Sequence, residues 1–179
     1  SHLGETVHVV HQCGRAHEDA ARALYAELGF GNRARIAPFI DDMPAALAAA
    51  DLVIGRAGAG AVAEICAVGR PSLLVPYPFA GDHQKLNADS ITREGAALWL
   101  PSAEATPVRL ATELRSLMDQ PERLATMAAT AARLGRPKAA HTIALDLLSL
   151  AGVSSELPTA NSKLPTPEEN GFVRMTEVA

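Results

Sequence analysis

Residues 51–64 have the sequence DLVIGRAGAGAVAE, in which an apolar run, a glycine-rich turn and a helix-forming stretch follow one another. The apolar run is typical of a buried strand, and the three glycines would let the backbone turn sharply and approach a ligand closely. The helix that follows would offer unpaired N–H groups and a partial positive charge to an anion. This order predicts a diphosphate site, with Glu64 near enough to accept hydrogen bonds from sugar hydroxyls.

The spacing of this turn matches neither a Walker A loop nor a full G-x-G-x-x-G fingerprint. No Lys-Ser or Lys-Thr pair follows the glycines, and position 63 is alanine. A plain strand-to-helix turn without a ligand therefore stays open as an alternative, because such turns often contain glycine.

A second polar group follows the next predicted strand. Gln84 and Asn87 are three residues apart, which puts both amides on one face at the start of a predicted helix. Each amide has donors and an acceptor, so the pair could recognise sugar hydroxyls. Asp82 is expected to cap this helix. His83 could touch a phosphate, although a solvated loop histidine is the alternative.

No residue set predicts a covalent nucleophile, a metal site or a bound cofactor. Cys13 and Cys66 lack the C-x-x-C or Cys/His spacing of a metal site, and they are expected to be small core residues without a disulfide. No Ser/His/Asp or Cys/His set is recognisable, so no catalytic residue is assigned in this chain.

The elements that would position these side chains alternate between strand and helix. Strands are predicted at 6–11, 35–39, 52–54, 72–76 and 96–100, and helices at 18–28, 45–50, 61–66, 85–94, 107–118, 121–134 and 138–150. Such alternation predicts an α/β domain with a doubly wound, Rossmann-like parallel sheet. Its ligands would bind beyond the carboxyl ends of the strands, where the loops 39–43, 56–64 and 78–87 are expected to converge.

Composition narrows the class of protein further. The chain has 179 residues, of which 48% are hydrophobic and 20% charged, a net charge of −4 and no dense basic stripe, so a nucleic-acid partner is not expected. Neither a membrane span nor a signal segment is recognisable, which favours a cytoplasmic location. Residues 1–150 form the predicted domain, and the proline-rich stretch 151–179 is expected to be a disordered tail.

Five motifs, taken in order, resemble the C-terminal half of the MurG family, the UDP-N-acetylglucosamine transferases of peptidoglycan synthesis, which have the two-domain GT-B fold. They are HQCGR at 11–15, FIDDM at 39–43, RAGAGAVAEI at 56–65, GRPSLLVPYPFAGDHQKLNA at 69–88 and EGAA at 94–97. In that family the C-terminal domain holds the sugar-nucleotide donor.

Carried over by position, the resemblance implies a role for individual residues. The main chain at Ile40 would bind uracil, Glu64 the ribose hydroxyls, and the amides of Ala59, Gly60 and Ala61 the diphosphate. Gln84 and Asn87 would bind N-acetylglucosamine, with His83 beside them. Ala61 stands where a Thr or Ser is often expected, so the diphosphate would rest on backbone N–H groups alone.

The resemblance also implies parts that this sequence lacks. The family's N-terminal domain, with its acceptor loops and catalytic base, and the first strand of the C-terminal domain would precede residue 1. The isolated chain is therefore expected to bind UDP weakly, to transfer no sugar, and to self-associate or lose stability through an exposed sheet edge or apolar patch.

The function implied is donor binding for an inverting transferase that moves N-acetylglucosamine from UDP-N-acetylglucosamine to the lipid-linked muramoyl-pentapeptide. That acceptor would bind the absent domain, and only the full-length protein would lie on the cytoplasmic face of the membrane. Another GT-B glycosyltransferase, a sugar-nucleotide epimerase and a non-catalytic UDP-sugar-binding subunit remain alternatives.

Overall fold

A computed structural model describes residues 7–79 and 81–151 of the chain. The strands are β1 (Val9–Gln12), β2 (Ala34–Ala37), β3 (Val53–Gly55), β4 (Ser72–Leu74) and β5 (Ala97–Trp99). The longer helices are α1 (Glu18–Glu27), α2 (Met43–Ala49), α3 (Ala59–Ala67), α4 (His83–Arg93), α5 (Pro107–Met118), α6 (Pro121–Leu134) and α7 (Ala139–Leu150). Short 3-10 turns lie at Arg15–His17 and Gly31–Arg33. The predicted alternation of strand and helix is confirmed, whereas the expected tail lies almost wholly outside the described residues.

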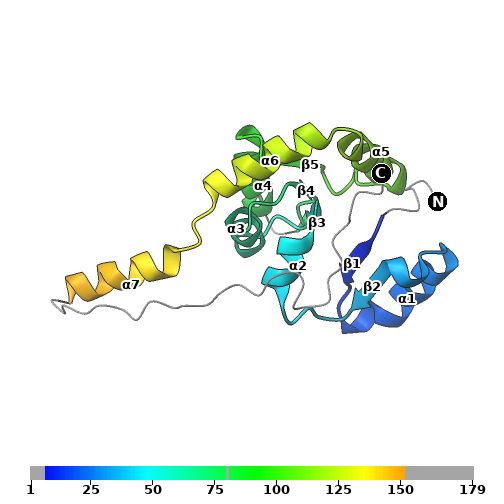
Figure 1. Cartoon of the computed structure of the whole chain (residues 1–179), viewed down its shortest axis with the longest axis horizontal. Helices are drawn as coiled ribbons and strands as arrows, with labels where there is room; N and C mark the ends of the chain where they lie inside the picture. Colours follow the sequence, from blue (N-terminus) through cyan, green and yellow to red (C-terminus); the bar gives the residue numbers. More distant parts are fainter. Residues whose placement is uncertain (1–6, 80, 152–179) are drawn as a thin grey trace.

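All pairings between the described strands are parallel, which confirms the predicted α/β class. They form a two-stranded sheet, β1–β2, and a three-stranded sheet, β3–β4–β5; in Figure 1 the three-stranded sheet lies above the two-stranded one, and β3 and β1 are the strands nearest to each other. This arrangement fits the doubly wound order 3-2-1-4-5-6 with the position between β1 and β3 not taken by a described strand.

The division into two sheets changes the environment of β3. Its apolar run predicts a buried strand, but the Ile54 side chain is 51% exposed because β3 is an edge strand of its sheet. β4 lies between β3 and β5, and all three of its residues are buried. The prediction that 52–54 is a buried strand is therefore wrong for β3, in which no residue is buried.

The core lies around the three-stranded sheet and the helices that pack against it. Leu74 of β4, Ile65 and Cys66 of α3, and Ile91 of α4 belong to one buried cluster, which Ala131 of α6 completes. α2 and α5 each begin at a residue whose side chain caps the helix. At the start of α2 the Asp42 carboxylate accepts a hydrogen bond of 3.0 Å from Ala45 N.

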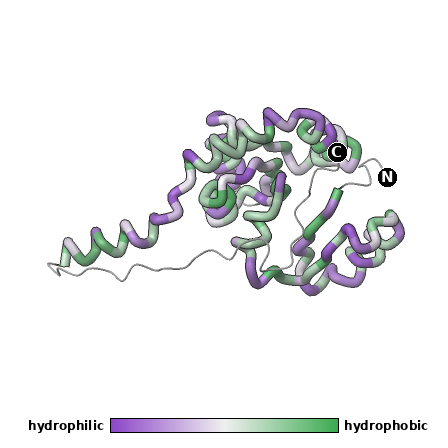
Figure 2. Tube along the Cα trace, viewed as in Figure 1, coloured by the Kyte–Doolittle hydropathy of each residue, from purple (hydrophilic) through white to green (hydrophobic). Residues whose placement is uncertain are grey.

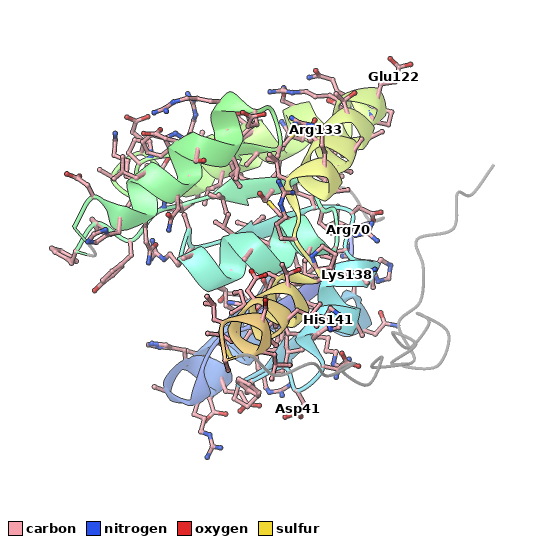
Figure 3. All side chains as sticks on the ribbon, turned by 90° about the vertical axis from the view of Figure 1, so that its left-hand side faces the viewer. Asp41, Arg70, Glu122, Arg133, Lys138 and His141 are labelled. Atoms are coloured by element: carbon pink, nitrogen blue, oxygen red, sulfur yellow. The ribbon has the colours of Figure 1, made fainter. Side chains whose placement is uncertain are left out.

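The last two helices differ in how they contact the body. α6 packs against α3, and Figure 3 shows Glu122 and Arg133 at opposite ends of α6. α7 extends away from the body (Figure 1), and Figure 2 shows hydrophobic residues along its length. It has no buried residue, and its Ile143, Leu147 and Leu150 side chains are exposed. Within the part of the chain that the structure describes, no helix has the length and apolar character needed to cross a bilayer.

Candidate functional site

The glycine-rich turn joins β3 to α3. Gly58 is the N-cap residue of α3 and provides no side chain, and the first intrahelical bond runs from Val62 N to Gly58 O at 3.0 Å. The amides of Ala59, Gly60 and Ala61 therefore precede the first helical hydrogen bond, and all three residues are exposed. The helix dipole adds partial positive charge at the same point, so these amides can receive an anion.

The glycines of this turn have no steric role within the protein itself. Gly55, Gly58 and Gly60 do not have positive φ, so the turn does not use the backbone conformations that only glycine adopts readily. A Cβ built on any of the three would meet no atom within 4 Å. The space above the turn is open, and a glycine there leaves room for a ligand to reach the backbone.

Glu64 lies on the same face of α3 as Gly60, one turn further along the helix, because residues four apart are stacked on a helix surface. The side chain is exposed. A carboxylate at this place can accept hydrogen bonds from a group bound at the helix start, as the sequence predicts for the ribose hydroxyls.

Asn87 is tied to the glycine turn. Its Nδ2 donates a hydrogen bond of 3.0 Å to the main-chain oxygen of Ala57, a residue that is fully buried. This bond orients the amide and directs Oδ1 away from Ala57. Asn87 therefore offers an acceptor, and one remaining N–H, to a ligand beside the turn.

Gln84 is oriented in the opposite sense. Its Oε1 accepts a hydrogen bond of 2.8 Å from Tyr77 N, so the carbonyl oxygen is engaged and Nε2 is left as the donor. Gln84 and Asn87 thus present different polarities, although the sequence offers two similar amides. Together they suit a sugar that accepts a hydrogen bond at one hydroxyl and donates one at another.

The other two residues at the start of α4 have less defined positions. His83 is the first residue of the helix and is exposed. Asp82 occupies the N-cap position, but its side chain makes no capping hydrogen bond. The predicted cap is therefore right in position and wrong in mechanism, because the Asp82 backbone is already helical at φ −77° and ψ −4°.

Ile40, expected to bind a base through its main chain, is joined to β1. Its N–H donates a hydrogen bond of 2.9 Å to Gln12 Oε1, which holds the loop after β2 against the end of β1. Of the three loops expected to converge, hydrogen bonds therefore link two, the glycine turn and the β4–α4 segment. The third loop, 39–43, is instead held by β1 through the bond between Ile40 and Gln12.

One residue in this region is absent from the sequence-based site. Arg56 follows β3 directly, and its Nη1 donates to Val75 O at 3.1 Å and to Pro76 O at 3.5 Å. Its guanidinium carbon also lies 5.5 Å from the centre of the Tyr77 ring. A basic residue at the carboxyl end of a strand, immediately before the glycines, is the signal that could have identified it.

Both cysteines are free thiols. Cys66 is buried, and burial raises the pKa of its thiol, whereas Cys13 is only partly buried and donates to Ala37 O at 3.3 Å. Over the described ranges 7–79 and 81–151, no group of three or more His, Cys, Asp or Glu residues is arranged to hold a metal ion.

Similarity to known proteins agrees with this geometry. Residues 1–143 match the model of the glycosyltransferase family 28 C-terminal domain. A protein of Sorangium cellulosum (strain So ce56) is 55% identical over 149 residues, which are 83% of this chain and 37% of that protein. A protein of Methylococcus capsulatus is 44% identical over 150 residues, 83% of this chain and 42% of that protein. Both are named UDP-N-acetylglucosamine–N-acetylmuramyl-(pentapeptide) pyrophosphoryl-undecaprenol N-acetylglucosamine transferase.

Solved structures give the same result. The crystal structure of Acinetobacter baumannii MurG is 35% identical, with a TM-score of 0.69 over 79% of this chain and 40% of that one. The glycosyltransferase of kitacinnamycin is 30% identical, with a TM-score of 0.51 over 77% of this chain and 34% of that one. The chain thus spans roughly two fifths of the curated relatives that it matches. It belongs to glycosyltransferase family 28, whose C-terminal domain it carries.

Proposed function

We propose that this chain binds the sugar-nucleotide donor of a transferase that moves N-acetylglucosamine from UDP-N-acetylglucosamine to a lipid-linked muramoyl-pentapeptide. Residues 1–150 are the donor-binding domain on this proposal. The diphosphate lies on the amides of Ala59, Gly60 and Ala61, and the sugar lies against Gln84 and Asn87, with His83 beside it. Glu64 accepts from the ribose, and the main chain at Ile40 reads the uracil.

The observation that carries the proposal is the bond between Asn87 Nδ2 and Ala57 O. It fixes an amide with a free acceptor next to three exposed amides that lack an intrahelical partner. A diphosphate on the helix start would place its attached sugar near that acceptor, because the two groups of a nucleotide sugar are covalently joined. The names of the relatives supply the identity of the sugar and of the acceptor.

The transfer itself belongs to the whole protein on this proposal. The chain spans 37% and 42% of the two relatives described above, and we assign the acceptor cleft and the catalytic base to the remainder. Contact with the membrane face, where a lipid-linked acceptor would be met, also belongs to the whole protein. No metal or cofactor is required by the residues assigned here.

Isothermal titration calorimetry of the chain with UDP, UDP-N-acetylglucosamine and UDP-glucose tests donor binding. We expect UDP to bind and UDP-N-acetylglucosamine to bind more tightly than UDP-glucose. Gly60→Asp is the matched control, because its carboxylate would repel the diphosphate while remaining compatible with a helix N-terminus. Binding by Gly60→Asp equal to that of the parent, or no binding by the folded parent, would overturn the proposal.

The similarity to the kitacinnamycin glycosyltransferase favours, as a second candidate, a different class of sugar donor. Tighter binding of UDP-glucose than of UDP-N-acetylglucosamine would favour a different sugar transferase. Transfer of sugar to a lipid acceptor by the isolated chain would contradict the assignment of the catalytic base to the rest of the protein.

A further inference from the structure

Arg56 holds the beginning of the segment that joins β4 to α4. Its Nη1 donates to the main-chain oxygens of Val75 and Pro76, at 3.1 and 3.5 Å. The guanidinium carbon lies 5.5 Å from the centre of the next aromatic ring, that of Tyr77. One side chain of the glycine turn therefore contacts three consecutive residues where the chain leaves β4.

The next residue of the turn holds the other end of the same segment. Ala57 O accepts from Asn87 Nδ2 at 3.0 Å, one turn into α4. Arg56 and Ala57 are consecutive, so the glycine turn contacts the β4–α4 segment both where it begins and where it enters the helix. A displacement of either contact changes how the amides of α4 lie relative to the turn.

Tyr77 connects Arg56 to the sugar-facing amide of Gln84. Tyr77 N donates to Gln84 Oε1 at 2.8 Å, and this bond is what leaves Gln84 Nε2 as the outward donor. The Tyr77 ring is 46% exposed and packs edge-on against Phe79, which is 83% exposed, at 5.6 Å between ring centres. The cation beside its ring and the bonds to the two preceding carbonyls restrain the position of Tyr77, together with its own bond to Gln84.

We infer that Arg56 is a positioning residue for sugar selectivity, which acts through Tyr77 to keep the Gln84 amide in its donor orientation. This inference rests on the proposed function, since it assigns a role within the same donor site. The contacts of Arg56 are to the loop carbonyls and the Tyr77 ring, so on this inference its effect on the sugar passes through Gln84. The guanidinium supplies both N–H donors to the two carbonyls and a planar group beside the Tyr77 ring, a combination that an ammonium lacks.

The test compares UDP with UDP-N-acetylglucosamine in four forms of the full chain: the parent, Arg56→Ala, Gln84→Ala and the double variant. We expect Arg56→Ala to weaken UDP-N-acetylglucosamine roughly 5- to 10-fold and UDP less than about 2-fold. We expect the double variant to bind no worse than Gln84→Ala, because both changes remove the same contact to the sugar. Arg109→Ala is the matched control, since this exposed α5 arginine pairs with Glu113 at 2.8 Å, on a helix outside the site.

Two results would overturn the inference. Equal weakening of UDP and the UDP-sugar by Arg56→Ala, with losses that multiply in the double variant, would mean that Arg56 contacts the diphosphate directly. Unchanged affinity for both ligands would mean that the contacts to Val75 and Pro76 have no role in binding. If Arg56→Ala does not fold, two other variants replace it: Arg56→Gln keeps a neutral donor, and Arg56→Lys keeps the charge. The inference then requires that both variants prefer UDP-N-acetylglucosamine over UDP less strongly than the parent does.

Hydrogen exchange in the absence of ligand separates this inference from the proposed function. The Tyr77 amide should exchange faster in Arg56→Ala than in the parent, because its bond to Gln84 loosens. A parent chain that binds neither ligand would refute the donor site and the selectivity role together, while the exchange rate still reports on the contact. Unchanged exchange at Tyr77 alongside normal ligand binding by the parent would refute the Arg56 inference alone.

Discussion

The side-chain nitrogen of Asn87 donates a hydrogen bond of 3.0 Å to the main-chain oxygen of Ala57, 30 residues earlier in the chain. This bond joins the first turn of α4 to the turn that precedes α3, and so connects the region expected to hold a sugar with the region expected to hold a diphosphate. Asn87 has a structural partner as well as a proposed ligand, which separates its expected behaviour from that of Gln84.

Asn87→Ala should therefore weaken both UDP and UDP-N-acetylglucosamine, because the glycine turn loses a partner at Ala57 O. From the sequence alone, the expectation is that both amides affect only the sugar. The bond between Asn87 and Ala57 O changes this expectation for Asn87→Ala. Gln84→Ala is still expected to affect only the sugar. We expect each lost hydrogen bond to cost about 1–2 kcal/mol. Titration of both variants with both ligands checks this, and an unchanged UDP affinity in Asn87→Ala would show that the bond to Ala57 is dispensable for the turn.

Gly60→Ala should raise the stability of the fold and lower the affinity for UDP. Alanine is favoured over glycine inside a helix by about 0.5–1 kcal/mol, and a Cβ at this position would meet no protein atom within 4 Å. The same methyl group would occupy the space that a diphosphate needs at the helix start, so we expect at least a roughly 10-fold loss of UDP affinity. Urea unfolding and calorimetry on one preparation measure the two effects.

Gly135→Ala is the contrasting variant, because the space there is filled by protein. A Cβ on Gly135 would collide with Cys66 O and approach Ala67 Cα at 3.0 Å, where α6 ends against the end of α3. We expect a loss of stability of about 1–3 kcal/mol. A Gly60→Ala variant that is less stable than the parent, or a Gly135→Ala variant of parental stability, would contradict this account of the two glycines.

The sequence predicts the order of strands and helices because the apolar runs are short and separated by glycine, proline and helix-capping residues. It does not predict that Ile54 is half exposed, because an apolar run does not reveal which strand ends a sheet. The polarity of the two amides is also beyond the sequence. The partners of Gln84 and Asn87, Tyr77 N and Ala57 O, are backbone groups whose approach depends on the fold.

The contrast between two strand residues gives a test of the sheet arrangement. Leu73 in β4 is fully buried and Ile54 in β3 is 51% exposed, although both belong to apolar runs. We expect Leu73→Ala to lower the free energy of unfolding by about 2–5 kcal/mol and Ile54→Ala by less than about 1.5 kcal/mol. Similar losses for the two variants in chemical denaturation would indicate that a further element covers β3 in solution.

The thiol of Cys66 predicts a dependence of stability on alkaline pH. Burial raises its pKa above the ordinary value, so the folded state holds the proton more strongly than the unfolded state does. The resulting stabilisation is fully present below the unfolded pKa of about 8.5 and declines as the pH rises through the raised value. Cys66→Ala should show a smaller loss of stability between about pH 8 and 10 than the parent. Cys13→Ala is the control, and an equal pH dependence in parent and Cys66→Ala would contradict the prediction.

Substitution of Glu64 tests whether this residue of α3 binds the ribose. The side chain is exposed and lies one turn beyond Gly60, on the face that continues from the helix start. If its carboxylate accepts from both ribose hydroxyls, Glu64→Ala should lower UDP affinity by about 1.5–3 kcal/mol, roughly 10- to 100-fold. Glu64→Gln keeps one acceptor oxygen and should lose less. Comparison with 2′-deoxy-UDP sharpens the test, because the parent should lose affinity for the deoxy ligand whereas Glu64→Ala should bind the two nucleotides almost equally. Parental UDP affinity in a folded Glu64→Ala variant would make Glu64 an ordinary residue of the helix surface.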